Sequence, residues 1–151
     1  MNTFLPYHDP VATARALDLA RLGKQLVECQ QLLNVLRGRR AGYAGHPAAR
    51  MWRGHEDWLA DYASGLSAEW LARRGRDHGS WLAIVAAGDV VEPASPPPWW
   101  WGDAAMAEEH RRNLVRKDPA RYGALWPGLA PLAGYRWPVA PGEWLDLRGS
   151  A

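Results

Sequence analysis

Several prolines directly follow a residue that can cap a helix. Three of these pairs stand before a helical pattern: Asp9-Pro10, His46-Pro47 and Asp118-Pro119. A capping side chain accepts hydrogen bonds from the free backbone N–H groups at a helix start, and proline at the first helical position loses no hydrogen bond. The pairs therefore predict three helix starts and a mostly helical chain.

The first start predicts one long helix from Pro10 to a stop at Gly38. Apolar residues recur in it at steps of three and four, the spacing of one helix face. That face consists of Leu22, Leu26, Cys29, Leu33 and Leu36. By the same spacing, a polar face collects Arg21, Lys24, Gln25, Glu28 and Gln31. The polar face gathers these groups around a single carboxylate.

Further helices are expected downstream. The segment that begins at His46-Pro47 should be helical to about Trp70, with an interruption at Gly54. Residues 80–91 favour helix over strand, because alanine is frequent and apolar residues do not alternate with polar ones. Another helix is expected over 104–117, and a short helical turn should run from Asp118-Pro119 to about Trp126.

Residues 92–102 interrupt this helical pattern with three consecutive prolines and three consecutive tryptophans. Consecutive prolines impose an extended conformation that cannot pair as a central strand, so we expect a stiff connector or surface loop. The tail, rich in proline and glycine, should wrap back on the helices. We therefore predict an all-α fold, a compact single-domain bundle over residues 1–151 with an irregular Pro/Trp-rich connector and C-terminal tail.

Composition excludes several classes of protein. A chain of 151 residues with 48% hydrophobic residues is long enough for one domain with a proper core. The lone Cys29 excludes an internal disulfide and a cysteine-based zinc site, and this fits a reducing compartment. The sequence contains neither a signal-peptide pattern nor an apolar stretch of about 18 residues. We expect a cytoplasmic protein that does not enter a membrane.

Basic residues gather in two places, although the formal net charge is only +2. The first cluster contains no acidic residue and consists of Arg37, Arg39, Arg40, Arg50 and Arg53. The second consists of Arg73, Arg74 and Arg76. Clustered cations suit a nucleic-acid partner, but a solvated surface gives the same pattern.

Glu28 is the first candidate for chemistry. A carboxylate on a polar helix face can act as general base, as general acid or as stabiliser of developing positive charge. Lys24 precedes it by one helical turn, and that spacing also forms ordinary surface salt bridges.

His46 is the second candidate, because it lies in the turn Gly45-His46-Pro47. A neutral imidazole there could orient a sugar or phosphate or transfer a proton. Alternatively, it caps a helix or is a buried hydrogen-bonding histidine.

Phosphate-binding groups recur within two turns of the helix expected at 104–117. They are His110, Arg111, Arg112, Asn113, Arg116 and Lys117, and about half of them must face away from any one surface. His8, His55 and His78 have no partner at metal-ligand spacing, so we expect no metal site. Because no nucleotide-binding glycine loop or nucleophile elbow occurs, we expect no cofactor.

The order of short motifs resembles a known family. The motifs are Leu17-Asp18, Val27-Glu28, Tyr43-Ala44-Gly45-His46-Pro47, His110 through Leu114, Arg116-Lys117-Asp118-Pro119 and Tyr122. Together they resemble the small pyrimidine-dimer DNA glycosylases of the phage-type endonuclease V family, and more closely an actinobacterial branch of it. The resemblance spans the chain from its start to about Trp137.

The resemblance implies a compact helical domain whose N-terminal α-amine attacks the sugar of a damaged nucleotide. An imine forms, and the strand can then be cleaved by elimination. An α-amine has a reference pKa of about 7.7 to 8.0, so a useful fraction is unprotonated at neutral pH. The amine would belong to Asn2, or to Met1 if that residue stays. Glu28 matches the family's essential glutamate, and His46 matches a histidine that binds or orients the substrate.

The sequence departs from the phage-type pattern beside the glutamate. Val27 precedes Glu28 and Gln31 follows three residues later, where phage-type members have arginines that grip DNA. Arg21 and Lys24 could replace that grip from the preceding turns. Gln25 could read a base edge or bridge phosphates.

We therefore expect a DNA glycosylase with abasic-site lyase activity that works as a monomer on damaged duplex DNA. Trp99, Trp100 and Trp101 could stack on bases or wedge between them, or could fold down over the core. Two alternatives stay open. One is a noncatalytic nucleic-acid-binding module, and the other is an enzyme acting on a modified nucleotide or small glycoside.

Overall fold

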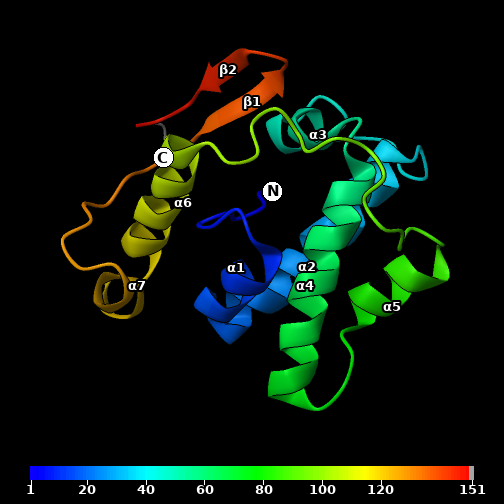
Figure 1. The fold of residues 1–151 in the computed structure, drawn as a ribbon, viewed down its shortest axis with the longest axis horizontal. Helices are drawn as coiled ribbons and strands as arrows, with labels where there is room; N and C mark the ends of the chain where they lie inside the picture. The colour runs from blue at the N-terminus through cyan, green and yellow to red at the C-terminus, as the bar shows by residue number, and fades with distance from the viewer. Residues whose placement is uncertain (150–151) are drawn as a thin grey trace.

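The computed structural model describes residues 1–149 and confirms a mostly helical fold (Figure 1). Within this range the chain forms seven helices and one antiparallel hairpin. The elements are α1 Pro10–Ala16, α2 Leu19–Leu36, α3 Pro47–Trp52, α4 Glu56–Arg74, α5 Gly79–Ala86, α6 Ala104–Lys117, α7 Pro119–Leu125, β1 Arg136–Ala140 and β2 Glu143–Asp146.

Two groups of helices lie on either side of the N-terminal segment. In Figure 1, α2 and α4 pack together on one side with α1 and α5 against them, and α6 and α7 form the other side. In the same view the β1–β2 hairpin lies above the N-terminal segment, and β1 packs against α3. The start of the chain is therefore enclosed by both groups of helices.

The expected single helix from Pro10 to Gly38 is wrong, because the chain breaks at Leu17-Asp18 into α1 and α2. Asp18 caps α2 by accepting from the N–H of Arg21 at 2.9 Å, and it also accepts from the Tyr122 hydroxyl at 2.7 Å. Although burial opposes it, hydrogen bonds from Tyr122 and Arg21 lower the pKa of Asp18 to about 2. This network favours a helix start over helix continuation.

Arg73 of α4 stabilises the same break by binding the C-terminal end of α1. Its guanidinium donates to the carbonyl oxygens of Leu17 at 2.7 Å and Ala14 at 3.0 Å, at the end of α1. These carbonyls have no partner within their own helix, so a cation there satisfies them. Part of the second basic cluster is therefore structural.

The other helix predictions are confirmed with small changes. The helical stretch after His46-Pro47 breaks at Gly54, whose φ of 82° suits glycine, into α3 and α4. The helix predicted at 80–91 ends earlier, at Ala86, and α6 has the predicted bounds. The tail wraps back on the helices but forms β1 and β2, which the sequence analysis did not predict.

The connector holds its tryptophans in different environments. Trp100 is 1% exposed in the core, and Trp101 packs beside it, so these two fold down rather than stack on a ligand. Trp99 is 39% exposed. Asp57 of α4 accepts hydrogen bonds from the backbone N–H groups of Ala94 and Ser95, both at 2.9 Å, and thereby fastens the connector.

No helix among residues 1–149 has the length and apolar character that crossing a membrane requires.

We predict that Gly65→Ala destabilises the fold where α1 meets α4. A Cβ at position 65 would lie 2.6 Å from the Cβ of Pro10 and 3.1 Å from its backbone carbon. The free energy of unfolding, measured in urea, should fall by about 1–3 kcal/mol. The control is Gly123→Ala in α7, where nothing lies within 4 Å and stability should hold or rise. Equal stability of Gly65→Ala and the wild type would contradict this close approach.

Candidate active site

The start of the chain crosses the middle of the molecule as an extended segment with no strand beside it. Thr3 and Leu5 are fully buried, and side chains replace the missing strand. The Leu5 N–H donates to Nδ1 of His110 at 2.9 Å, and the Trp52 indole donates to the Thr3 hydroxyl at 2.8 Å. Burial lowers the pKa of His110 to about 3, so its ring stays neutral and can accept this bond.

Gln25 of α2 holds the same segment through both ends of its amide. Its Oε1 accepts from the Phe4 N–H at 2.9 Å, and its Nε2 donates to the Asn2 carbonyl at 3.1 Å. The buried Tyr62 hydroxyl donates to the Phe4 carbonyl at 2.7 Å and lies 3.0 Å from Oε1 of Gln25. The Gln25 amide therefore fixes the position of Asn2 along the axis of α2.

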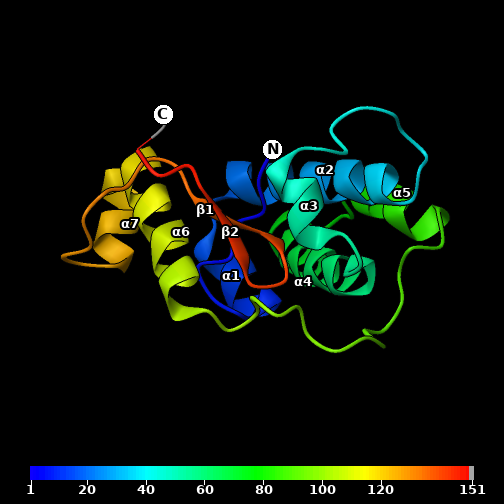
Figure 2. The ribbon, with the colours of Figure 1, turned by 90° about the horizontal axis from the view of Figure 1, so that it is seen from above.

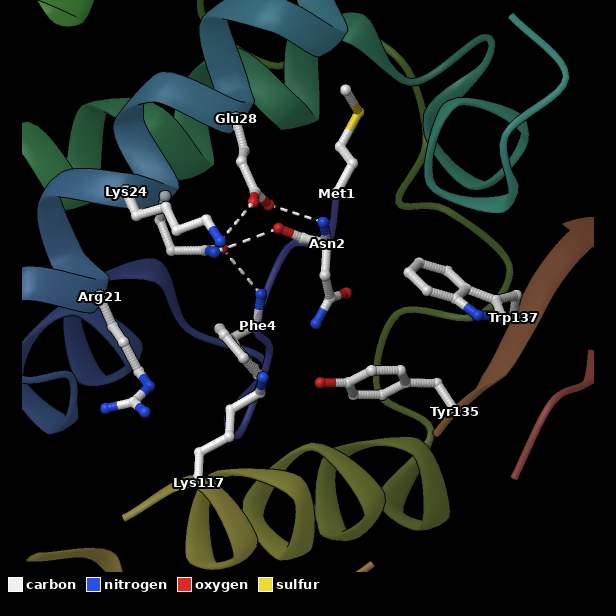
Figure 3. A pocket seen from close by; sticks show the side chains of 10 residues that line it. Met1, Asn2, Phe4, Arg21, Lys24, Glu28, Lys117, Tyr135 and Trp137 are labelled. Carbon is white, nitrogen blue, oxygen red and sulfur yellow. Dashed lines mark hydrogen bonds and ion pairs between the residues drawn. The ribbon is translucent and has the colours of Figure 1, made fainter. Parts of the chain in front are cut away.

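Glu28 lies one turn beyond Gln25 on the same helix and faces the same segment. Its Oε2 accepts a hydrogen bond from the Asn2 backbone nitrogen at 2.6 Å, and its Oε1 lies 3.8 Å from Nζ of Lys24 (Figure 3). Only 7% of Glu28 is exposed, whereas the Lys24 side chain is 73% exposed. The pair is thus not a simple surface salt bridge, because the carboxylate is buried against the start of the chain.

A pocket of about 240 Å³ opens beside Glu28 and Asn2. Figure 3 shows Glu28 on one side and the rings of Tyr135 and Trp137 on the other. The lining residues are Met1, Asn2, Phe4, Arg21, Lys24, Gln25, Glu28, Lys117, Tyr135 and Trp137. The pocket thus combines one carboxylate, an aromatic wall and several cations.

The cations surround the pocket from both groups of helices. Arg21 is held by Asp18, with Nη1 2.8 Å from the carboxylate oxygen. Lys117 approaches from the end of α6, and Arg116 lines an adjoining hollow that shares Lys117 and the two aromatic rings. Partial burial first, and then the charges of Arg116, Arg21 and Lys24, lower the pKa of Lys117. This positive rim suits an anionic substrate.

Of the residues predicted to contact DNA, four surround the pocket: Arg21, Lys24, Arg116 and Lys117. Three others are almost fully buried, namely Gln25, His110 and Asn113, although Gln25 lines the pocket and Asn113 lines the adjoining hollow. The amide nitrogen of Asn113 donates to the backbone carbonyls of Glu109 and Gly134, at 2.9 and 2.8 Å. Arg111 and Arg112 fasten loops by donating to the carbonyls of Pro6 and Ala130, at 2.8 and 2.9 Å.

His46 caps α3, which is the alternative left open above. Its Nδ1 accepts from the Ala48 N–H at 3.1 Å, and its ring meets the edge of Trp137 at 6.0 Å. Partial burial, followed by the positive charge of the nearby N-terminus, lowers the pKa of His46. His46 therefore adjoins the pocket behind Trp137 and does not line it.

The first basic cluster is partly neutralised. Arg39 forms a two-point ion pair with the buried Asp89, at 2.6 and 2.7 Å, and Arg37 lies 3.6 Å from the same carboxylate. Within residues 1–149, no ion pair forms at Arg40, Arg50 or Arg53. Among residues 1–149 no cluster of histidine, cysteine, aspartate and glutamate has the size and spacing to hold a metal ion.

Three residues that line the pocket were not singled out from the sequence: Phe4, Tyr135 and Trp137. Tyr135 and Trp137 lie in the tail, and they reach the pocket because β1 packs against α3. Their spacing of two, beside a proline and glycine turn, is typical of a strand that presents one face. Tyr62, which supports Gln25, was not singled out from the sequence either.

We predict that Gln25→Leu loosens the start of the chain. The substitution leaves the buried Phe4 N–H without its acceptor and removes the link to the Asn2 carbonyl. A buried unsatisfied donor costs about 1–3 kcal/mol, so urea unfolding should show a loss of this size. Gln31→Leu on the same helix is the control and should keep wild-type stability. Amide exchange at Phe4 should quicken in Gln25→Leu, and unchanged exchange would contradict the clamp.

Comparison with known proteins gives one match. A family model described as pyrimidine dimer DNA glycosylase matches residues 1–83, more than half of the chain. Neither a curated protein nor a solved structure shows a significant match. The matched part contains Glu28, Asn2 and His46, whereas Lys117, Tyr135 and Trp137 lie beyond it.

Proposed function

The chain belongs to the pyrimidine dimer DNA glycosylase family, and from this premise we propose that it excises a damaged base from duplex DNA and then acts as an abasic-site lyase. The nucleophile in this proposal is the N-terminal α-amine, and Glu28 is the acid–base group. The pocket between α2, α6 and the hairpin receives the nucleotide. The proposed amine chemistry requires neither a cofactor nor a metal.

One observation carries the proposal: the Asn2 nitrogen lies 2.6 Å from Oε2 of Glu28. In a chain from which Met1 has been removed, this nitrogen is the α-amine. A buried carboxylate within hydrogen-bond distance of an amine can take up its proton and return it later. In a chain that keeps Met1, the amine lies one residue further out, where its charge acts on His46.

The reaction follows from this pairing. The neutral amine attacks C1′ of the damaged nucleotide, an N–C1′ bond forms, and the base departs with the electrons of the glycosidic bond and a proton. Opening of the C1′–O4′ bond then gives an imine, with a proton moving to O4′. Loss of a C2′ proton expels the phosphate from C3′, and water finally releases the amine. Glu28 stabilises the positive charge that develops on the sugar and relays these protons.

The other pocket residues suit the remaining parts of the substrate. A base inside a duplex must be turned out before an amine can reach its sugar, and the wall of Tyr135 and Trp137 offers it an aromatic surface. Arg21, Lys24, Arg116 and Lys117 offer charges to the flanking phosphates. His46 packs against Trp137 and thereby helps to position the deoxyribose through that ring.

The test is Glu28→Gln, which keeps the size of the side chain and its ability to accept the Asn2 hydrogen bond. Borohydride trapping on duplex DNA with an abasic site or a thymine dimer should be slower by at least about a hundredfold, the usual contribution of an acid–base group. DNA affinity should stay near that of the wild type.

The matched control is Glu108→Gln on the exposed side of α6, which should trap DNA at the wild-type rate. Equal trapping by Glu28→Gln and the wild type would overturn the role of Glu28. A wild-type protein that binds duplex DNA, has a free N-terminus and traps neither substrate would instead be a binding module.

A further inference from the structure

Tyr43, in the loop between α2 and α3, combines exposure with backbone strain. It is 56% exposed, the largest fraction among the large hydrophobic side chains of the described residues. Its φ of 57° is the one positive φ outside glycine in residues 1–149. Figure 2 shows this loop arching away from the helices on its way to α3.

The fold itself does not explain a tyrosine at this position. Glycine or asparagine adopts the left-handed conformation at lower cost than an aromatic residue, and an exposed ring adds little to the core. Backbone strain persists where surrounding structure enforces it, and it concentrates at ligand-binding sites. The enforcing contacts are a hydrogen bond from the His46 N–H to the Tyr43 carbonyl at 2.9 Å and one from Arg53 to the Ala44 carbonyl at 2.6 Å.

A row of aromatic rings connects Tyr43 to the pocket. The Tyr43 ring lies 6.4 Å from that of His46, which lies 6.0 Å from that of Trp137. Trp137 in turn lies 5.5 Å from Tyr135 in the pocket wall. His46 is therefore the one ring between Tyr43 and the aromatic wall of the pocket in this row.

Positive charge accompanies the exposed ring. The guanidinium of Arg40, which is itself exposed, lies 5.8 Å from the centre of the Tyr43 ring. An aromatic ring beside a cation matches the repeating unit of a nucleic-acid strand, in which each base is followed by a phosphate.

We propose that Tyr43 is a DNA-stacking residue, whose ring enters the base stack of a duplex and fills the opening left where a nucleotide has been turned out or has lost its base. The contacts that enforce its left-handed backbone hold the ring outward before DNA arrives, and Arg40 moves from the ring to a neighbouring phosphate. The inference rests on the proposed function in one respect, that the substrate is duplex DNA.

The experiment measures binding without catalysis. Fluorescence anisotropy gives the affinity for an intact duplex and for the same duplex carrying one tetrahydrofuran abasic analogue, which cannot form an imine. The wild type should prefer the abasic duplex. Tyr43→Ala should lower affinity for that duplex by about tenfold, the loss expected for one base–aromatic stack, and should bind the intact duplex almost as the wild type does.

Two further variants separate the effect of the aromatic ring from the effect of the backbone conformation. Tyr43→Phe keeps the ring and should keep the preference. Tyr43→Gly relieves the strain and removes the ring, so it should behave like Tyr43→Ala. Leu82→Ala, at a 53% exposed position on α5, is the control and should match the wild type.

The proposal is overturned if the wild type has no preference for the abasic duplex, if Tyr43→Ala keeps that preference, or if Tyr43→Phe loses it. These outcomes are independent of borohydride trapping. A Tyr43-dependent preference without trapping would remove the proposed catalysis and leave the stacking residue. If the Tyr43→Ala protein is trapped on DNA and keeps the preference for the abasic duplex, the proposed catalysis stands and the stacking role of Tyr43 is overturned.

Discussion

The buried start of the chain constrains the rest of the structure. An extended segment inside a protein must find partners for its backbone N–H and carbonyl groups, and here no strand supplies them. Gln25 and Glu28 from α2, Tyr62 from α4 and His110 from α6 supply them instead. The two groups of helices are thereby joined through the N-terminal segment, and the Asn2 nitrogen is held in a fixed position beside α2.

This arrangement links stability to chemistry. Gln25 and Glu28 are three residues apart on one helix, so both face the same segment. Gln25 binds the Asn2 carbonyl and Glu28 binds the Asn2 nitrogen. A buried carboxylate is costly unless it is paired, and here the backbone N–H of Asn2 and the ammonium of Lys24 both lie beside it. The same pairing that stabilises Glu28 places it against the proposed nucleophile.

The sequence predicted most helices because capping residues, prolines and glycines act locally, as at Asp118-Pro119 and Gly54. It did not predict the break at Asp18, because that break depends on Tyr122 and Arg73, which are remote in sequence. For the same reason the polar face of α2 looked solvent-exposed, although Gln25 is 1% exposed against the N-terminal segment. The pocket's carboxylate and the four cations around it were recognised from residue type, whereas its aromatic wall needed the β1–β2 hairpin.

The central claim is that the N-terminal amine beside Glu28 is the reacting group. Its most direct test is to trap the wild-type protein on abasic duplex DNA with borohydride, digest the adduct and locate the modified residue by mass spectrometry. The account predicts a single adduct on the N-terminal α-amine, carried by Asn2 where Met1 has been removed. An adduct on the side chain of Lys24 or Lys117, which share the pocket, would contradict it, as would an unmodified N-terminus in a cleaving enzyme.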